Sequence, residues 1–586
     1  MYNDNMFDTL QEKFKGDIEI SDAMREKYST DWSLFKIVPT AIVSPKDAQD
    51  IKTLVTWVNE YNSNLTKDQE KLSITARAAG TDMTGGPLNH GIIMDVNRHM
   101  TGVLDVSKTN HYPNQTSFWG HDYAITGQAT VLPGTFYRDF EPETYAKNLV
   151  LPCYPASKGI CAVGGMVANN GAGEKSLKYG QNKDFVQQLK VVLADGNEYT
   201  VHPLSKKELD AKIAQKDFEG DIYKQIWELV RDNERLIKSK QPKTSKNAAG
   251  YYLWDVIQAP SVDAFVRGEG AFDLTKLFVG AQGTTGMISE ITYKLVEVET
   301  QSDLLVVFVD DLNTVPELVE KLMGSDLEML EMYDDQTFKT GLSFFGDFIK
   351  DKGFFGAIKY ALRFFPEVWM MLSTLRVPKL IVLAEFVSND EGGLHVEMQE
   401  AVDHIKSLGM RMRQVRNKRG EERFWDFRHD SFKLLTEHTM ATRESGDGTR
   451  TAPFIDDIAV NPKDLPEYLP KLMDILVAHN LDYTIAGHLG NGNFHIIPLM
   501  DMKKEENRNK IFEVSDEVYE LALQYEASIT AEHNDGIIRT AYLPMMFGDS
   551  MTALFGKVKR IFDPENIFNP GKKVGITKDD MKKYLA

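Results

Sequence analysis

The pattern of apolar residues differs between two stretches of the chain. In the first, short apolar runs alternate with glycine clusters over residues 71–98 and 150–200, a pattern typical of strands joined by tight loops. The run LKVVLADGNEYTV in this stretch predicts a hairpin that turns at Asp195-Gly196. Beyond residue 300, apolar strands alternate instead with helical patterns. We therefore expect a domain boundary near residues 298–303.

The second stretch predicts two strand–helix–strand units. LLVVFVDD and LEMLEMYD flank a predicted helix from Val315 to Met323, and KLIVLAEF precedes another helix in LHVEMQEAVDHIKSLG. This order predicts an α+β layer with helices on one face of an antiparallel sheet. Near the N-terminus, we expect a strand ending at Pro39 and a helix from Pro45 to Trp57 that is capped by Ser44.

Length, charge and cysteine content narrow the class of protein. The 586 residues, 42% of them hydrophobic, are enough for two or three domains. The formal net charge of −19 argues against nucleic acid as the main partner. Cys153 and Cys161 are too few for a four-cysteine iron–sulfur cluster, and they favour a reducing compartment. We see neither a secretory signal nor a long apolar run, so we expect a cytoplasmic protein without a membrane-spanning helix.

Two short motifs near the C-terminus gather residues that suit metal or acid–base chemistry. GHLGNGNFH places His488 and His495 around a glycine-rich turn, and AEHND places Glu532 next to His533. Neutral imidazole and carboxylate together bind zinc, manganese or iron. Imidazole also exchanges a proton near neutral pH. Taken alone, the motifs fit a loop of hydrogen-bonded histidines equally well.

Three glycine-bearing loops lie upstream of these motifs, at residues 75–86, 162–180 and 276–290. Glycine allows a backbone to approach a ligand closely, and successive N–H groups in such loops bind pyrophosphate. None of the loops matches G-x-G-x-x-G after a strand or the P-loop with its lysine. Three such loops in one stretch nevertheless favour a nucleotide cofactor over ordinary turns.

With these loops and both C-terminal motifs, the chain resembles the FAD-linked oxidases and dehydrogenases of the vanillyl-alcohol-oxidase (PCMH) type. Within that family it is similar to the branch of D-lactate, glycolate and D-2-hydroxyglutarate dehydrogenases. The resemblance covers nearly the whole chain and includes the ending FDPENIFNPGK. It implies an α+β fold with a two-part PCMH-type FAD-binding domain over residues 1–300. A ferredoxin-like α+β cap domain over 301–530 and a short segment over 531–586 that returns toward the flavin would follow.

The resemblance implies that all three loops and the return segment contact FAD. The implied cofactor-binding residues are Arg77, Ala79, Gly80, Thr81, Asp82, Thr84, Gly85, Gly164, Gly165, Ala168, Asn169, Asn170, Gly173, Tyr179, Gly180, Gly283, Thr284, Gly286 and Asn569. Some relatives attach FAD covalently through a histidine of the first loop. This chain has no histidine at that place, so non-covalent FAD is implied. Gln282 stands where many relatives carry glutamate.

The resemblance also gives the motif residues separate roles. His488, His495 and Glu532 would bind a divalent metal, either zinc, manganese or iron, and His533 would act as the base. The metal would lower the pKa of a substrate hydroxyl, and FAD would accept the hydride. Arg428, in EERFWDFRHDSF, is the implied partner of the substrate carboxylate. The alternative is that Arg428 is a surface residue of an amphipathic helix.

Departures from the family pattern bear on the substrate. Ile455 stands where the 2-hydroxyglutarate enzymes place a lysine, which favours a small D-2-hydroxy acid such as D-lactate, oxidised to pyruvate. Asn534 and Asp535 replace a small and an apolar residue, and we expect Asp535 to add negative charge near the metal or the substrate. The alternatives are glycolate, D-2-hydroxyglutarate or a longer 2-hydroxy acid. A non-catalytic FAD-binding subunit of a larger complex is a further alternative.

Residues 342–379 combine aromatic and basic side chains in an otherwise acidic chain. Between Lys350 and Lys379 there are six basic and two acidic residues. Cations among aromatic residues suit an amphipathic helix at a membrane surface. We therefore predict a peripheral contact with the anionic inner face of the cell membrane, with electrons passing to a quinone or another acceptor. The alternative is a helical hairpin packed on the cap domain or at a dimer contact; whether the protein is an oligomer is left open.

Overall fold

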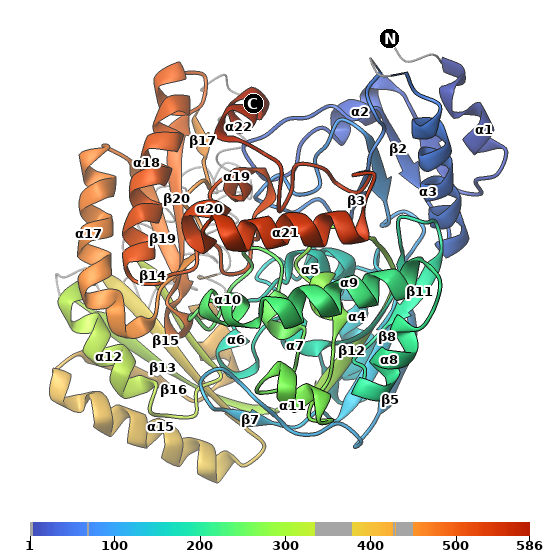
Figure 1. The fold of residues 1–586 in the computed structure, drawn as a ribbon. Coiled ribbons are helices and arrows are strands. Elements are labelled where there is room, and N and C mark those ends of the chain that lie inside the picture. The colour runs from blue at the N-terminus through green and yellow to red at the C-terminus, as the bar shows by residue number, and fades with distance from the viewer. Residues whose placement is uncertain (1–3, 67–68, 335–377, 423, 426–427, 429–448) are drawn as a thin grey trace.

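The computed structural model describes residues 4–66, 69–334, 378–422, 424–425, 428 and 449–586. These residues form an N-terminal domain, coloured blue to green, and a C-terminal domain, coloured yellow to orange (Figure 1). Apart from Pro378 and Lys379, the aromatic and basic stretch at 342–379 lies outside the described residues. Within the described part of the chain, no helix is long and apolar enough to cross a membrane.

The N-terminal domain begins with a four-stranded sheet in the order β1-β2-β4-β3. Its strands are β1 (Asp17–Glu19), β2 (Ala41–Ser44), β3 (Ile74–Arg77) and β4 (Ile92–Asp95). β4 pairs in parallel with β2 and β3, and β1 runs antiparallel to β2. All residues of β2 and β4 are buried, as expected of apolar runs in parallel strands that are covered on both faces.

Helix α3 (Ala48–Ser63) covers this sheet, but its start differs from the prediction. The cap is Asp47, whose side chain accepts a hydrogen bond from the Asp50 N–H group. Ser44 is instead the last residue of β2, where it pairs with Asp17, so it cannot cap the helix. The strand expected to end at Pro39 is likewise wrong, because the strand begins at Ala41.

The second half of the N-terminal domain is an antiparallel sheet in the order β11-β10-β12-β8-β5, with β9 paired to β12. Its strands are β5 (Val103–Lys108), β8 (Gly127–Val131), β9 (Leu149–Val150), β10 (Val186–Val192), β11 (Glu198–Val201) and β12 (Met287–Glu297). The hairpin predicted at Asp195-Gly196 is confirmed, since β10 and β11 pair on either side of it and Gly196 has φ 77°.

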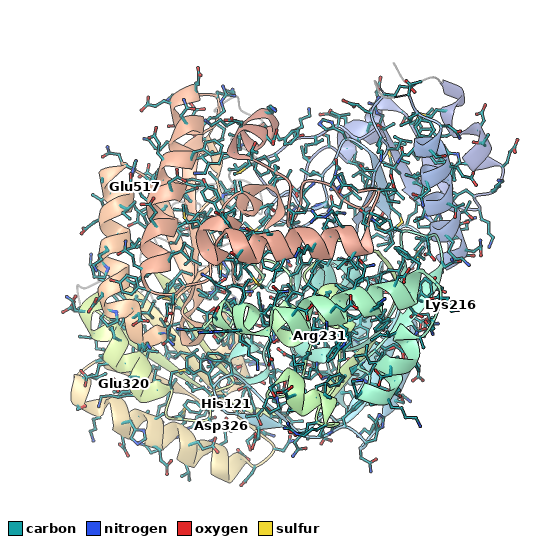
Figure 2. All side chains as sticks on the ribbon, in the orientation of Figure 1. His121, Lys216, Arg231, Glu320, Asp326 and Glu517 are labelled. Atoms are coloured by element: carbon teal, nitrogen blue, oxygen red, sulfur yellow. The ribbon has the colours of Figure 1, made fainter. Side chains whose placement is uncertain are left out.

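Short helices surround this second sheet. They are α4 (Tyr137–Tyr145), α5 (Val163–Asn169), α6 (Ser176–Tyr179), α7 (Asn182–Phe185), α8 (Lys206–Ile213), α9 (Phe218–Asp232), α10 (Glu234–Ser239) and α11 (Val262–Val266). A separate ribbon of β6 (Gln115–Thr116) and β7 (Asp122–Tyr123) reaches toward the C-terminal domain. His121 of this ribbon lies 2.9 Å from Asp326 of the other domain, at the point where Figure 2 labels both residues.

The C-terminal domain is built on one eight-stranded sheet in the order β16-β13-β15-β14-β19-β20-β17, with β18 paired to β20. The strands are β13 (Gln301–Val309), β14 (Met329–Asp334), β15 (Leu380–Ser388), β16 (Arg411–Val415), β17 (Thr449–Thr451), β18 (Ile458–Ala459), β19 (Asp482–His488) and β20 (Asn493–Asp501). All of their pairings are antiparallel.

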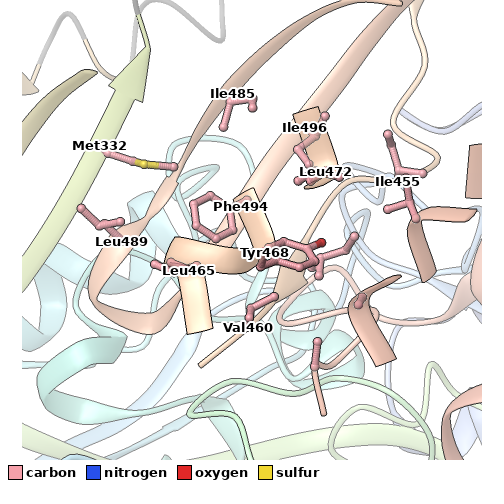
Figure 3. Close-up of a cluster of buried hydrophobic side chains, with 14 of the residues drawn as sticks. Met332, Ile455, Val460, Leu465, Tyr468, Leu472, Ile485, Leu489, Phe494 and Ile496 are labelled. Atoms are coloured by element: carbon pink, nitrogen blue, oxygen red, sulfur yellow. The ribbon is translucent and has the colours of Figure 1, made fainter. Parts of the chain in front are cut away.

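Four helices cover one face of this sheet (Figure 1). They are α12 (Val315–Leu322), α15 (Glu391–Ile405), α17 (Leu465–Ala478) and α18 (Glu505–Gln524). The predicted α+β layer with helices on one face of an antiparallel sheet is therefore confirmed. Figure 3 shows part of the core between the sheet and these helices, where Met332, Phe494 and Leu472 are buried. The opposite face of the sheet turns toward the N-terminal domain and carries the polar residues described below.

After α18 the chain returns to the N-terminal domain. It forms α19 (Gly536–Thr540), α20 (Leu543–Phe547) and α21 (Asp549–Phe562), and α21 lies alongside α9 (Figure 1). The Asn569 N–H group then donates to the Ile74 carbonyl of β3 at 2.9 Å. The chain ends after α22 (Lys578–Tyr584), where Leu585 pairs with Phe35. The returning segment thus ties the two domains together behind the site.

Candidate active site

A cavity of about 740 Å³ lies between the two domains. The loop residues that border it are Arg77, Ala79, Gly80, Thr81, Asp82, Gly164, Gly165, Ala168, Asn169, Gly283 and Gly286. Its other end is bordered by Arg428, His495, Glu532 and His533. The three glycine loops and the C-terminal motifs, which lie hundreds of residues apart in sequence, therefore face one common space.

The remaining predicted loop residues lie behind the cavity wall. They are Thr84, Gly85, Asn170, Gly173, Tyr179, Gly180, Thr284 and Asn569. Asn569 donates from Nδ2 to the carbonyls of Gly86 and Gln282, at 3.0 and 2.7 Å. Asn170, in the left-handed region at φ 51°, donates to the hydroxyl of Tyr252 at 2.8 Å. These side chains hold the loops in place.

Asp82 fastens the first loop to the second. Its Oδ2 atom accepts hydrogen bonds from the N–H groups of Thr84 and Gly86, at 3.0 and 2.8 Å. Its Oδ1 atom accepts from the Asn169 side chain at 2.7 Å. Both carboxylate oxygens are bonded to donors of the protein, so Asp82 borders the cavity without an unsatisfied oxygen.

Arg77, at the end of β3, is held by the segment at residues 28–32, which precedes β2. Its guanidinium donates to the carbonyls of Tyr28 and Thr30, at 3.2 and 2.9 Å. Trp32 of the same segment borders the cavity, and its N–H group donates to the Asp82 carbonyl at 3.0 Å. Sequence reasoning missed Trp32, since a single tryptophan ahead of the first glycine loop carries no motif.

The Asn534-Asp535 pair does not border the cavity. Asn534, at φ 73°, donates from Nδ2 to the carbonyls of Asn169 and Gly280, and so joins the second and third loops. Asp535 lies 2.8 Å from Lys573, and both side chains are fully buried. The expectation that Asp535 adds negative charge near the metal or the substrate is therefore wrong, because the Lys573 ammonium balances that charge away from the cavity.

A single carboxylate oxygen lies at the centre of the histidine cluster. Oε1 of Glu532 is 3.4 Å from Nε2 of His488, 3.3 Å from Nε2 of His495 and 3.7 Å from Nε2 of His533. β19 ends at His488, and a tight turn through Gly492, at φ 61°, leads into β20, which carries His495. A side chain at Gly492 would collide with the Val460 carbonyl, so the turn requires glycine.

Each of the three imidazoles has a carboxylate beside its other nitrogen. Nδ1 of His488 lies 2.5 Å from Glu331, and Nδ1 of His495 and of His533 lie 3.1 and 2.7 Å from Asp456. A carboxylate on Nδ1 fixes the ring and leaves Nε2 for a metal or a proton. Three Nε2 atoms that face one carboxylate oxygen match the donor set of a zinc, manganese or iron site.

Opposite charges within the cluster stabilise one another. Burial alone lowers the pKa of His495, but Asp456 and Glu532 outweigh burial and raise that pKa to about 10. Burial likewise opposes the charged form of Glu532, yet Lys246 and His488 hold the pKa of this carboxyl well below its usual value. The pKa shifts of His495 and Glu532 therefore favour the charged form of each group despite burial.

Asp457, which sequence reasoning did not single out, organises the second motif. Its Oδ2 atom accepts four hydrogen bonds, from the hydroxyl of Thr530 and the N–H groups of Ala531, Glu532 and His533. Its Oδ1 atom accepts from the Asn493 side chain at 3.1 Å. Ligand atoms of Asp457, His495, Glu532 and His533 lie within 4.8 Å of one another. Because the oxygens of Asp457 already accept these donors, we assign it to loop structure rather than to metal binding.

Arg428 and Ile455 lie in different places. Arg428 borders the cavity, is 7% exposed and donates to Glu331 at 3.4 Å, so the alternative of a surface arginine is wrong. Ile455 is fully buried in the core of the C-terminal domain, where Figure 3 labels it, and it does not border the cavity. Its side chain therefore says nothing about the substrate. Thr484, Ala486 and Ile497 form the cavity wall beside the histidines instead.

Gly164 and Gly165 allow steric effects inside the cavity to be separated from effects on folding. A methyl group on Gly164 would lie 2.6 Å from the Pro133 carbonyl, whereas one on Gly165 would meet only Ala78 at 3.4 Å. We expect Gly165→Ala to keep its melting temperature and to bind FAD about 10-fold more weakly, since the methyl group takes cavity space. Flavin fluorescence titration measures this affinity. Wild-type affinity in Gly165→Ala would place the cofactor elsewhere.

Two family models match the chain. The FAD binding domain matches residues 39–202, which include the first two glycine loops. The C-terminal domain of FAD linked oxidases matches residues 299–573, which include Arg428 and all four motif residues. The two matches fall in the two domains that border the cavity.

Curated relatives match nearly the whole chain. D-2-hydroxyglutarate dehydrogenase of Pantoea ananatis is 26% identical over 568 residues, which cover 95% of this chain and 50% of that protein. Glycolate oxidase subunit GlcD of Bacillus subtilis is 23% identical, covering 97% of this chain and 95% of that one. A probable mitochondrial D-lactate dehydrogenase of Danio rerio is 23% identical, covering 96% and 89%. The chain spans about half the length of the first curated relatives it matches.

Solved structures of low sequence identity share the fold. p-Cresol methylhydroxylase with substrate bound has a TM-score of 0.64 and 14% identity, over 98% of each chain. 4-Ethylphenol oxidase from Gulosibacter chungangensis has a TM-score of 0.63 and 13% identity, also over 98% of each chain. The predicted PCMH-type α+β fold is confirmed by these similarities. The two matched domains, at residues 39–202 and 299–573, show that the chain belongs to the family of FAD linked oxidases.

Proposed function

We propose that this protein is an FAD-dependent, metal-assisted dehydrogenase of a small D-2-hydroxy acid, with D-lactate as its preferred substrate. One observation carries the proposal: His495, Glu532 and His533 border the same cavity as the three glycine loops, and His488, which does not border it, lies 3.4 Å from Glu532. Relatives named for D-2-hydroxyglutarate, glycolate and D-lactate support the 2-hydroxy-acid class.

The cavity suits FAD in size and chemistry. Its volume of about 740 Å³ is typical of a cofactor site, and glycine loops such as those that line it are the kind of backbone that binds pyrophosphate. Gly80, Thr81 and Asp82 offer no histidine for a covalent link, which supports non-covalent binding. When bound, FAD supplies the two-electron acceptor for the hydride.

The motif residues also suit a divalent cation. We propose His488, His495 and Glu532 as its ligands, with the Nδ1 partners Glu331 and Asp456 fixing the two imidazole rings. When bound, zinc, manganese or iron supplies Lewis acidity that lowers the pKa of a coordinated hydroxyl.

His533 is best placed to act as the base. Its side chain is 22% exposed, against 13% for His495 and 3% for His488, and its Nε2 atom is the farthest of the three from Glu532. We propose that Nε2 of His533 takes the hydroxyl proton of the substrate. Asp456, 2.7 Å from Nδ1, would hold the ring and stabilise the resulting imidazolium.

The cavity wall supports a small monocarboxylate. Arg428, the implied carboxylate partner, lies at the same end of the cavity as the histidines. Among the described residues of the wall, the only other arginine or lysine is Arg77, whose guanidinium is held by backbone carbonyls. Among the described wall residues, a second substrate carboxylate would therefore have no further cation, whereas Ala486 and Ile497 favour a methyl group. This favours D-lactate over D-2-hydroxyglutarate.

The electron acceptor and the location of the protein are proposed from the sequence alone. We propose a quinone or another acceptor at the inner face of the cell membrane, in contact with anionic lipid. This proposal depends on residues 342–379, of which the structure describes only Pro378 and Lys379.

Anaerobic bleaching of the bound flavin tests the proposed reaction. We expect D-lactate to bleach the flavin absorbance faster than L-lactate, glycolate or D-2-hydroxyglutarate. Of the four, only D-lactate has a single carboxylate, a methyl group and the D configuration at the carbon that bears the hydroxyl. Faster bleaching by D-2-hydroxyglutarate would contradict the substrate assignment. Bleaching by none of the four would favour a non-catalytic FAD-binding subunit.

A further inference from the structure

A lysine outside both C-terminal motifs reaches the centre of the site. Lys246 is fully buried, and its ammonium group has three acceptors. Nζ lies 3.1 Å from Oε2 of Glu532, 3.3 Å from Oδ1 of Asn493 and 3.3 Å from the carbonyl of Gly173. An ammonium group has three N–H donors, so each can meet one of these acceptors.

The backbone around Lys246 is clamped between two parts of the site. The Asn247 N–H group donates to the Gln181 side chain at 3.0 Å, just after the second glycine loop. The Ala248 N–H group donates to the carbonyl of Thr530, just before the second motif, at 2.9 Å. These two backbone hydrogen bonds fix the position of Lys246. Its buried ammonium group is then both paired and hydrogen-bonded, as a buried charge requires.

Because of the position of Lys246, the two carboxylate oxygens of Glu532 have different partners. The lysine holds Oε2, and Oε1 is left facing the Nε2 atoms of His488 and His495. A carboxylate held at one oxygen offers the other to a cation as a single ligand. Lys246 does not itself border the cavity, so its effect on the site passes through Glu532.

We infer that Lys246 is a positioning residue that fixes Glu532 as a one-oxygen ligand of the divalent cation. It also links that ligand to Gly173 of the second glycine loop, which joins the metal end of the cavity to its cofactor end. This inference rests on the proposed metal-assisted function. It predicts that loss of the ammonium weakens metal binding, since the carboxylate is then free to turn away from His488 and His495.

The structure offers a matched control in Lys573. This lysine is also fully buried, lies 2.8 Å from Asp535 and donates to the carbonyls of Ala248 and Gly250. Lys246 and Lys573 thus form buried ion pairs with carboxylates three residues apart, Glu532 and Asp535, but only Lys246 contacts a proposed ligand. Lys246→Met and Lys573→Met therefore remove equivalent charges with different expected effects on the metal.

The test compares Mn²⁺ affinity in FAD-loaded wild type and both variants, using the electron paramagnetic resonance signal of free Mn²⁺. Both variants should melt at a lower temperature, since each removes the ammonium group beside a buried carboxylate. Only Lys246→Met should bind Mn²⁺ more weakly, by about 10–100-fold. If Lys246→Met does not fold, Lys246→Gln, which can still donate to Gly173, replaces it.

Two results would overturn the inference. The first is a Lys246 variant that binds Mn²⁺ as tightly as the wild type, or more tightly. The second is a Lys573→Met protein whose Mn²⁺ affinity falls as much as that of the Lys246 variant. Failure of the wild type to bind Mn²⁺, Zn²⁺ or Fe²⁺ is a different outcome. It would reject the metal-assisted function itself, and the role of Lys246 with it.

Discussion

Replacing His533 by glutamine is expected to slow flavin reduction by D-lactate about 10²–10⁴-fold at saturating substrate, the usual contribution of a positioned base. Asp456 lies 2.7 Å from Nδ1 of the imidazole, and the Nε2 atom lies at the cavity end where Glu532 is found. Glutamine keeps polar atoms of similar reach but takes up no proton near neutral pH. Anaerobic stopped-flow absorbance of the flavin measures the rate directly.

FAD and metal contents of the His533→Gln protein must be measured beside the rate. Both should equal those of the wild type, because His533 is proposed as the base and not as a ligand. His121→Gln is the matched control, since His121 also lies near a carboxylate, Asp326 at 2.9 Å, but does not border the cavity. A His533→Gln protein without metal would make His533 a ligand, and one with the wild-type rate would need another base.

The four motif residues are recognisable in the sequence because each pair lies within one short segment. His488 and His495 end up on paired strands across one turn, and Glu532 and His533 are neighbours. Their partners are not recognisable in this way. Glu331 lies 157 residues from His488 along the chain. The two residues meet because their strands, β14 and β19, are neighbours in the folded sheet. Pairs at such separation depend on tertiary structure.

The misread positions show a second limit of sequence reasoning. Asp535 was expected to add negative charge near the metal or the substrate, but it pairs with Lys573, 38 residues further along, in a fully buried contact. Ile455 lies beside Asp456, which borders the cavity, yet its own side chain points into the core of the sheet and helices. Residue type indicates what a side chain can do; its direction is set by strand and loop geometry.

The fold was more readily predicted, since its signals are local and repeated. Alternating strand and helix patterns beyond residue 300 predicted the antiparallel sheet with helices on one face, which is observed. The start of α3 was missed because Ser44 and Asp47 are both good caps. Pairing of Ser44 with Asp17 in the sheet decides between them, and that contact is not local.

Asp457→Asn is expected to disable the site although it replaces no proposed ligand or base. Asparagine keeps the size of the side chain and tolerates the left-handed backbone at φ 72°. Its amide offers only one acceptor oxygen, whereas both aspartate oxygens accept hydrogen bonds here. In either orientation an NH₂ group would face a donor, so the protein should lose at least about 1–3 kcal/mol of stability.

The larger effect of Asp457→Asn should fall on the reaction. The N–H groups of Glu532 and His533 would lose their shared acceptor, so ligand and base would both shift. We expect flavin reduction to fall by about 10²-fold or more, the cost of a displacement of about 1 Å. The readouts are the stopped-flow rate and the free energy of unfolding in urea.

Asp50→Asn provides the comparison for Asp457→Asn. Asp50 is also buried and accepts hydrogen bonds from the N–H groups of Lys15 and Lys46, both at 3.0 Å, but it does not border the cavity. Its replacement should cost stability and leave the rate of flavin reduction unchanged. Equal loss of rate in both variants would mean that Asp457 acts through general stability. A wild-type rate in Asp457→Asn would mean that Glu532 and His533 keep their positions without this carboxylate.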